Sequence, residues 1–137
     1  LMKRVEVIKL NRDELHEWLA FKGLEASVEG AEDLNCFAEH FSQAEHIIVT
    51  DGAKGAYLLA AGKVWHHPIF SVEVVDTVGS GDAFLAGYLH AQAQGMNVMD
   101  TLRWASAAAC RVSGFRGATP LLDVQLLQEF LTQHPPI

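Results

Sequence analysis

Apolar and polar residues are arranged along this chain of 137 residues with two different periods. Short runs of mostly apolar residues predict buried strands, whereas apolar residues three or four positions apart predict helices with one buried face. The runs predict strands at residues 4–10, 46–50, 56–60, 63–67 and 71–75. The helical spacing predicts helices that begin at Asn11 and end near Gly23, and further helices at residues 31–43, 82–94, 98–113 and 123–134.

The order of these elements indicates an α/β fold. Strands that alternate with helices predict a mostly parallel sheet covered by helices on both faces, and the tight Ala61-Gly62 turn predicts an antiparallel hairpin at one edge. A sheet whose first strand begins the chain could be complete, but such a strand often needs neighbours on both sides. We therefore expect residues 1–137 to form one incomplete domain, the C-terminal portion of a longer enzyme.

The composition narrows the class of protein further. Half of the residues are hydrophobic and a fifth are charged, which excludes extended disorder. No apolar stretch approaches the roughly 20 residues that cross a membrane. The two cysteines, Cys36 and Cys110, lack CxxC spacing, so neither a zinc ribbon nor a disulfide framework is predicted. A reduced compartment and a cytoplasmic location are therefore expected.

The net charge of −7 is unevenly distributed. Residues 11–45 hold nine acidic and two basic side chains, whereas the remaining residues hold eight of each. Nucleic-acid-binding domains usually carry a basic face, so a nucleic-acid partner is not expected. The neutral remainder of the chain is compatible with an anionic ligand.

A glycine turn at residues 75–84, with the sequence VDTVGSGDAF, joins an apolar run to a predicted helix. Gly79 and Gly81 let a ligand approach the backbone, and the first N–H groups of a helix have no acceptor within the helix. Together with the helix dipole, these donors suit a phosphate group. Asp82, in the first helical turn, is placed to accept a proton from an attacking hydroxyl.

The same spacing is also compatible with a purely structural turn, in which Asp82 is only a carboxylate that stabilises the helix start. Three other motifs are absent. The P-loop pattern does not occur, and the dinucleotide pattern would need glycine where Phe84 stands. A nucleophile elbow would need glycine at Val78, which makes Ser80 a small turn residue rather than a nucleophile.

Residues 76–87, with Asp76, Gly79, Ser80, Gly81 and Asp82 at their motif positions, closely resemble the D-T-x-G-A-G-D signature of the ribokinase-like, phosphofructokinase B family of sugar kinases. Ser80 replaces the more common alanine. The resemblance implies that Asp82 is the catalytic base and that the backbone from Gly79 to Asp82 forms the anion hole. It also implies a monovalent cation, K⁺, near Asp76.

A second match lies at residues 9–14, KLNRDE, which resemble the family motif K-P-N-x-x-E with Leu10 in place of proline. The resemblance implies that Asn11 helps to position phosphate and metal-bound water, and that Glu14 belongs to the Mg²⁺ shell. Without the companion motif, Asn11 would be interpreted as a helix N-cap and Glu14 as an acidic residue in the first helical turn.

A third match lies at residues 49–56, VTDGAKGA, which are similar to the strand and G-x-x-G loop that lie along the nucleotide in this family. Thr50, Gly52 and Gly55 are the implied nucleotide-binding residues. Asp51 stands where an apolar residue is more usual, and the sequence offers no explanation for it.

The predicted helix at residues 98–113 is rich in alanine and resembles the family helix beside the adenine. The resemblance implies that Ala108 contacts the nucleotide. Small residues in a helix also permit close packing against another helix, and this alternative remains open.

These features predict the nucleotide-binding portion of an ATP- and Mg²⁺-dependent sugar kinase that phosphorylates a sugar or sugar-phosphate hydroxyl. The N-x-x-E-L form of the first motif favours the 1-phosphofructokinase and tagatose-6-phosphate kinase branch over ribokinase- or fructokinase-type substrates. By resemblance, most sugar-binding residues and the lid lie in an N-terminal part, so this chain alone is expected to be inactive and the full-length protein to form a homodimer. A non-catalytic nucleotide-sensing module and a dinucleotide-dependent oxidoreductase are the alternatives.

Overall fold

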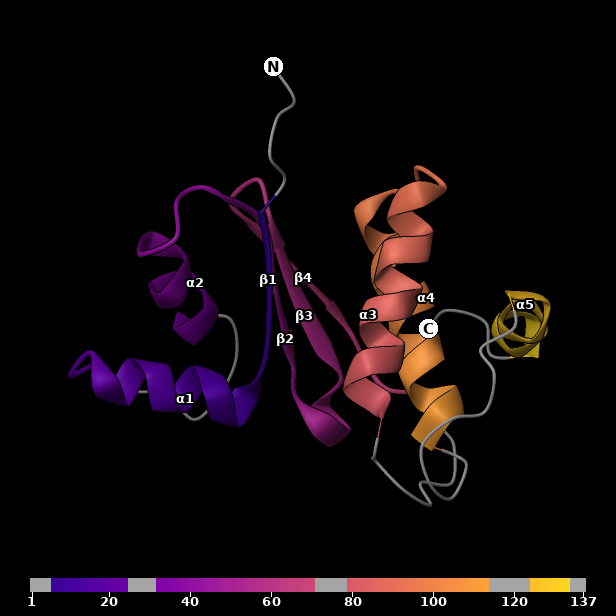
Figure 1. The fold of residues 1–137 in the computed structure, drawn as a ribbon, viewed down its shortest axis with the longest axis horizontal. Helices are drawn as coiled ribbons and strands as arrows, with labels where there is room; N and C mark the ends of the chain where they lie inside the picture. Colours follow the sequence, from indigo (N-terminus) through magenta and orange to yellow (C-terminus); the bar gives the residue numbers. More distant parts are fainter. Residues whose placement is uncertain (1–5, 25–31, 71–78, 114–123, 134–137) are drawn as a thin grey trace. The chain divides into compact units, whose positions relative to one another are not determined.

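The structure is a computed structural model, and it describes residues 6–24, 32–70, 79–113 and 124–133. The chain divides into two compact units, Leu1–His66 and His67–Ile137. In the described residues, the first unit contains a sheet and the helices α1 and α2, and the second contains α3, α4 and α5 (Figure 1). Each unit has its own cluster of buried hydrophobic residues.

The sheet has four described strands in the order β1-β2-β3-β4: β1 (Glu6–Asn11), β2 (Ala44–Thr50), β3 (Ala56–Ala60) and β4 (Lys63–His67). Strands β1 and β2 are parallel, whereas β2 and β3 are antiparallel. The described sheet is therefore mixed, with the parallel pair on one side and the predicted hairpin at the edge. The strand predicted at residues 71–75 lies outside the described residues.

The hairpin of β3 and β4 agrees with the prediction residue for residue. Its two connecting residues, Ala61 and Gly62, have φ angles of 50° and 76°. Two consecutive positive φ angles are typical of the tight turns that match the twist of antiparallel strands.

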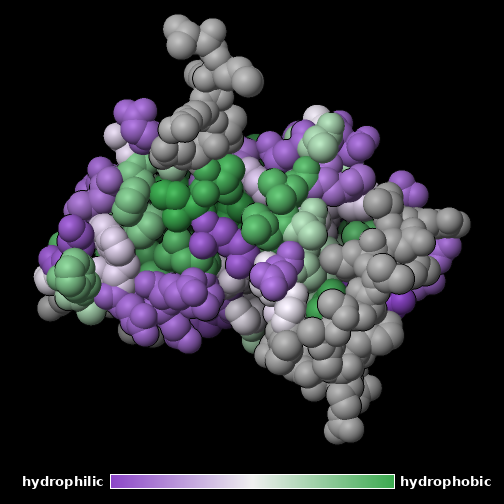
Figure 2. All heavy atoms as spheres, in the orientation of Figure 1, coloured by the Kyte–Doolittle hydropathy of each residue, from purple (hydrophilic) through white to green (hydrophobic). Residues whose placement is uncertain are grey.

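Helices α1 (Arg12–Phe21) and α2 (Glu32–Glu39) pack against the sheet and against each other, on the same side of the strands (Figure 1). In Figure 2, hydrophobic residues gather over the strands of this unit and hydrophilic residues surround them. The buried cluster that joins helices to strands consists of Leu10, Leu15, Leu19, Leu34, Phe37, Ile47, Val49 and Leu59.

Helix α2 is shorter than the predicted span of residues 31–43. After Glu39 the backbone hydrogen bonds join residues three apart, as in a 3₁₀ turn. The N–H groups of His40 and Phe41 donate to the carbonyl groups of Phe37 and Ala38 at 3.0 Å each. The His40 ring also lies 3.1 Å from the Cys36 carbonyl oxygen through Nδ1. A side chain that takes a helical carbonyl competes with the next α-helical turn, which explains the early end.

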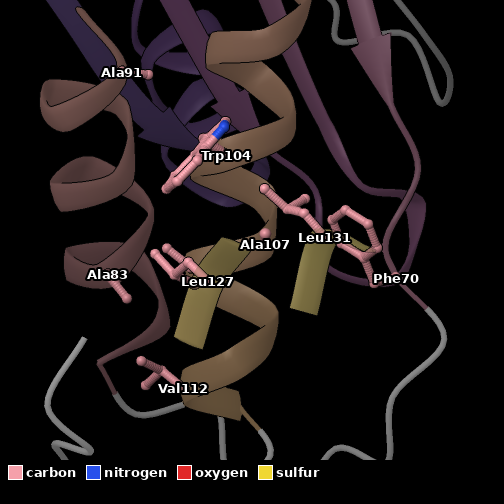
Figure 3. Close-up of a cluster of buried hydrophobic side chains, with 9 residues drawn as sticks. Phe70, Ala83, Ala91, Trp104, Ala107, Val112, Leu127 and Leu131 are labelled. Atoms are coloured by element: carbon pink, nitrogen blue, oxygen red, sulfur yellow. The ribbon is translucent and has the colours of Figure 1, made fainter. Parts of the chain in front are cut away.

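The second unit contains α3 (Ser80–Ala93), α4 (Val98–Ser113) and α5 (Val124–Gln133). Phe70 and side chains from all three helices belong to one buried cluster, in which the Trp104 ring lies between α4 and α3 (Figure 3), 5.2 Å from the His90 ring. The α4 bounds match the prediction, and the α5 bounds differ from it by one residue at each end. None of the helices in the described part of the chain is long and apolar enough to cross a membrane.

Helix α3 begins at Ser80, two residues earlier than predicted, because Gly79 adopts the left-handed φ of 81° and acts as the N-cap. The helix ends at Ala93, one residue before the predicted end, with Gln94 as the C-cap and Gly95 following it as predicted. Gly95 has a φ of 69°, and the N–H of Met96 donates to the Ala91 carbonyl at 3.1 Å. This arrangement is the Schellman motif, in which a glycine after the last helical turn satisfies the final carbonyl groups.

Candidate functional site

Two predicted site residues of the first unit end neighbouring parallel strands. Asn11 is the last residue of β1, Thr50 is the last residue of β2, and the two are register partners. Because parallel strands run in the same direction, the segments that follow Asn11 and Thr50 leave from the same edge of the sheet. In open α/β sheets, ligands bind at the carboxyl ends of the strands.

Asn11 and Glu14 form a reciprocal capping box at the start of α1. The Asn11 Oδ1 atom accepts a hydrogen bond from the Glu14 N–H at 2.8 Å, and the Glu14 Oε2 atom accepts one from the Asn11 N–H at 2.9 Å. The cap predicted as the structural alternative is therefore present. It fixes both side chains in place and leaves Glu14 exposed to solvent.

The loop after β2 folds back on itself through its own backbone. Gly52–Lys54 forms one 3₁₀ turn, the Lys54 N–H donates to the Asp51 carbonyl at 2.9 Å, and the Asp51 N–H donates to the Gly55 carbonyl at 2.8 Å. Gly52 and Gly55 have φ angles of 50° and 93°, in the region that favours glycine. The two predicted nucleotide-binding glycines therefore shape this loop.

The sequence did not predict the ion pair between Arg12 and Asp51. The Nε and Nη2 atoms of Arg12 each lie 3.1 Å from the Asp51 Oδ2 atom. The position of Asp51, unexplained by the sequence, is thus explained by an ion pair. The sequence pattern that could have predicted this pair is that Arg12 and Asp51 each directly follow a strand end. Parallel pairing of the two strands brings those ends together.

In the second unit, the predicted anion hole coincides with the N-terminus of α3. The first backbone bond inside this helix joins the Ala83 N–H to the Gly79 carbonyl at 2.9 Å. The N–H groups of Ser80, Gly81 and Asp82 precede that bond and are among the donors that a helix leaves for a ligand. Asp82 is exposed, whereas Ser80 and Gly81 are half-buried.

Ala108 lies in the contact between α3 and α4 and is fully buried. A Cβ atom built on Gly87 would lie 2.9 Å from the Ala108 Cβ and 3.0 Å from the Ala105 Cα. The small residues therefore serve close helix packing, the alternative that the sequence left open. The predicted contact between Ala108 and a nucleotide stays a prediction.

The predicted site residues fall into two groups, one in each unit. Asn11, Glu14, Thr50, Gly52 and Gly55 share the strand-end edge of the first unit. The second group, in the second unit, consists of Gly79, Ser80, Gly81, Asp82 and Ala108. Asp76, the predicted residue near a monovalent cation, lies outside the described residues.

Among the residues that the structure describes, two titratable groups have displaced pKa values. Burial lowers the pKa of His46, and the neighbouring Glu45 carboxylate opposes that change. Burial raises the pKa of the Cys110 thiol, opposed by a hydrogen bond from the Phe70 backbone. His46 lies inside β2, away from the strand end at Thr50, so its lowered pKa concerns stability rather than the candidate site.

The described residues contain no group of three or more His, Cys, Asp or Glu side chains that could hold a metal ion. This arrangement excludes a metal cage within the described part of the chain. It is compatible with Mg²⁺, which is usually held by one or two carboxylates together with substrate phosphates and water. Glu14 is exposed and fixed by its cap, so it fits the role of such a carboxylate.

Comparisons with known proteins identify relatives of this chain. The profile of the pfkB family of carbohydrate kinases matches residues 1–124. A 1-phosphofructokinase from Haloferax volcanii is 41% identical over 104 residues, which cover 75% of this chain and 32% of that protein.

Solved structures of two ribokinases have a similar fold. The ribokinase of Thermotoga maritima aligns with a TM-score of 0.80 and 27% identity over 92% of this chain and 42% of its own. The ribokinase of Arabidopsis thaliana, solved with ribose and ATP, aligns with a TM-score of 0.79 and 26% identity over 92% of this chain and 40% of its own. The chain spans less than half the length of each of these relatives.

Proposed function

We propose a function for this chain, which belongs to the pfkB family of carbohydrate kinases. The chain supplies the nucleotide-binding part of an enzyme that transfers the γ-phosphoryl group of ATP to a sugar or sugar-phosphate hydroxyl. Its ribokinase-like fold supports this assignment. Because the chain spans only part of its relatives, we further propose that residues 1–137 alone do not turn over substrate.

The observation that carries the proposal is the N-terminus of α3. A glycine in the left-handed conformation starts the helix, three backbone N–H groups precede the first intrahelical bond, and Asp82 stands in the same turn. Backbone donors held by a helix are already oriented before the reaction begins. They stabilise the charge that develops on a transferring phosphoryl group, without reorganisation during the reaction.

Asp82 is the proposed general base. It lies in the first turn of α3, where the helix dipole favours its ionised form. Its carboxylate would accept the proton of the attacking hydroxyl while the neighbouring N–H groups hold the phosphoryl group. General-base assistance of this kind is typically worth about 10²–10⁴ in rate.

The proposed metal side of the site is the capping box of the first unit. Asn11 would position phosphate and metal-bound water, and Glu14 would contribute a carboxylate oxygen to the Mg²⁺ shell. Magnesium, when bound, neutralises charge on the phosphates of ATP. The reciprocal hydrogen bonds of the cap orient both side chains before a ligand arrives.

The remaining proposed contacts concern the nucleotide and a monovalent cation. Thr50, Gly52 and Gly55 would lie along the nucleotide, and the loop shape of the two glycines allows close approach of a ligand to the backbone. Ala108 would lie beside the adenine, and Asp76 would stand near a K⁺ ion. These roles follow from the family motifs.

For the acceptor, we propose a sugar phosphate of the 1-phosphofructokinase or tagatose-6-phosphate kinase type. The support is the 41% identity with the 1-phosphofructokinase of Haloferax volcanii, together with the N-x-x-E-L form of the first motif. A ribose- or fructose-type acceptor is the alternative.

The deciding experiment measures sugar phosphorylation by the complete protein that carries this chain, as wild type and as Asp82→Asn. The variant keeps the size of the side chain and removes the base, so kcat should fall by about 10²-fold or more. The KM for ATP and the melting temperature should stay near the wild-type values. Preserved turnover in the variant would eliminate the base assignment.

A second experiment uses residues 1–137 alone. We expect the isolated chain to show no turnover with fructose 1-phosphate, fructose 6-phosphate or tagatose 6-phosphate, and brisk turnover would refute that expectation. A complete protein that binds ATP but phosphorylates none of a panel of sugars and sugar phosphates would support the non-catalytic module. Binding of NAD without binding of ATP would support an oxidoreductase.

A further inference from the structure

Arg12 and Asp51 stand at equivalent places in the two predicted nucleotide-site segments of the first unit. Arg12 directly follows Asn11, and Asp51 directly follows Thr50. Because Asn11 and Thr50 are register partners in parallel strands, the two charged residues leave the sheet side by side. One begins the helix behind the capping box, and the other begins the glycine loop.

The Arg12 guanidinium is held by groups from three different elements. Its Nε and Nη2 atoms each lie 3.1 Å from the Asp51 Oδ2, and its Nη1 atom lies 3.7 Å from the Asp33 Oδ2 of α2. Its central carbon lies 5.4 Å from the centre of the Tyr57 ring on β3. These contacts fix the planar group in one orientation.

The pair is also largely shielded from water. The side chains of Arg12 and Asp51 are 13% and 16% exposed, and that of Asp33 is 4% exposed. Charges in such surroundings are weakly screened by salt and keep their geometry better than exposed ion pairs. Two carboxylates compensate the charge of Arg12, which makes it a poor anchor for a further phosphate.

Asp51 closes the loop with its backbone and anchors it with its side chain. Its N–H donates to the Gly55 carbonyl at 2.8 Å, and its carbonyl accepts from the Lys54 N–H at 2.9 Å. Asp51 therefore joins the two ends of the loop through its backbone, and its side chain ties them to Arg12. Arg12 holds that side chain from a position one residue beyond Asn11.

We propose that Arg12 and Asp51 form a positioning pair, which keeps the loop of residues 51–55 in fixed register with the capping box of Asn11 and Glu14. The inference deepens the proposed function and rests on it, because the loop and the cap are the proposed nucleotide and metal sides of the site. Neither member of the pair contacts the ligand; each acts through the segment that it anchors.

The test labels the glycines of the complete protein with ¹⁵N and compares wild type, Arg12→Gln, Asp51→Asn and the double variant. Without nucleotide, each single variant should shift the amide signals of Gly52 and Gly55 and leave those of Gly23 and Gly95 in place. ATP binding should weaken by about tenfold in each single variant and no further in the double variant, because partners in one interaction are not additive. The KM for the sugar should stay unchanged.

Asp33→Asn is the matched control, since it removes the other carboxylate beside Arg12 and leaves Asp51 intact. It should leave the signals of Gly52 and Gly55 in place, because Arg12 keeps both of its 3.1 Å contacts with Asp51. The proposal is overturned if the Gly52 and Gly55 signals do not shift in the Arg12 and Asp51 variants, or if the losses of ATP affinity in the two variants are additive. Shifts of the same size in Asp33→Asn would overturn it as well. If the wild-type protein fails to bind ATP, the proposed function is overturned. The shifts of the Gly52 and Gly55 signals still show whether Arg12 and Asp51 position the loop.

Discussion

The two units hold their candidate site residues by different kinds of interaction. In the first unit, polar side chains fix one another, through the capping box of Asn11 and Glu14 and the ion pair of Arg12 and Asp51. In the second unit, the candidate groups are backbone N–H donors at the start of α3, and the helix is held by close apolar packing against α4.

The difference predicts different sensitivities. Hydrogen bonds and ion pairs are directional, so the first unit should respond to changes of charge or hydrogen-bonding group at nearly constant volume. Close packing depends on shape, so the second unit should respond to one added methyl group at constant polarity. Substitutions that separate volume from polarity are therefore the sharpest tests.

The largest of these effects is expected for Gly87→Ala in α3. An added Cβ would lie 2.9 Å from the Ala108 Cβ, 3.0 Å from the Ala105 Cα and 3.0 Å from the Trp104 carbonyl oxygen. Two of these neighbours are backbone atoms, which cannot turn away. The free energy of unfolding should fall by about 1–3 kcal/mol in chemical denaturation.

Helix propensity alone predicts the opposite sign for this substitution, because alanine in a helix is favoured over glycine by roughly 1 kcal/mol. The matched control is Ala86→Gly on the exposed side of the same helix, which should cost roughly that amount. A gain of stability in Gly87→Ala would show that α3 and α4 do not approach as closely as described.

A smaller loss is expected for Asn11→Ala in the first unit. The substitution removes the side-chain acceptor of the Glu14 N–H, a cap worth about 0.5–2 kcal/mol of unfolding free energy. Asn11→Ser changes the group but keeps a good cap, so its stability should stay near that of wild type. Equal losses in the two variants would contradict the capping role.

The same two variants separate the capping role of Asn11 from its proposed role in binding ATP. If Asn11 positions phosphate as proposed, the serine variant should bind ATP more weakly even though its thermal unfolding is unchanged. Titration calorimetry of the complete protein measures this difference. Wild-type affinity in the serine variant would limit Asn11 to its structural role.

The smallest expected effect is the pH dependence carried by His46. Burial holds its pKa below the ordinary value of 6.5, so the unfolded chain binds more protons than the folded one as the pH falls through that value. Stability should therefore decrease from about pH 6.5 downward, until the lower folded-state pKa is passed. In His46→Gln, melting temperatures between pH 7 and pH 5 should fall less steeply than in wild type; parallel curves would contradict this assignment.

The local signals of the sequence predicted most element types. The bounds of the hairpin and of α4 are confirmed, and the glycines at positions 23 and 95 end their helices as left-handed residues. The predicted end of α2 was wrong because the His40 side chain, just after the helix, lies against the carbonyl group of Cys36. The predicted start of α3 was wrong because Gly79 serves as its N-cap. Such competition is decided by individual bonds rather than by periodicity.

The sequence by itself determined the family, the positions of the three motifs and the types of most elements, because these depend on residues close together along the chain. Only the tertiary structure decided that Asp51 pairs with Arg12, 39 positions away, and that Ala108 lies against Gly87. The physical reason is that strand register and helix approach set the distances between remote residues. Periodicity along the chain does not encode those distances.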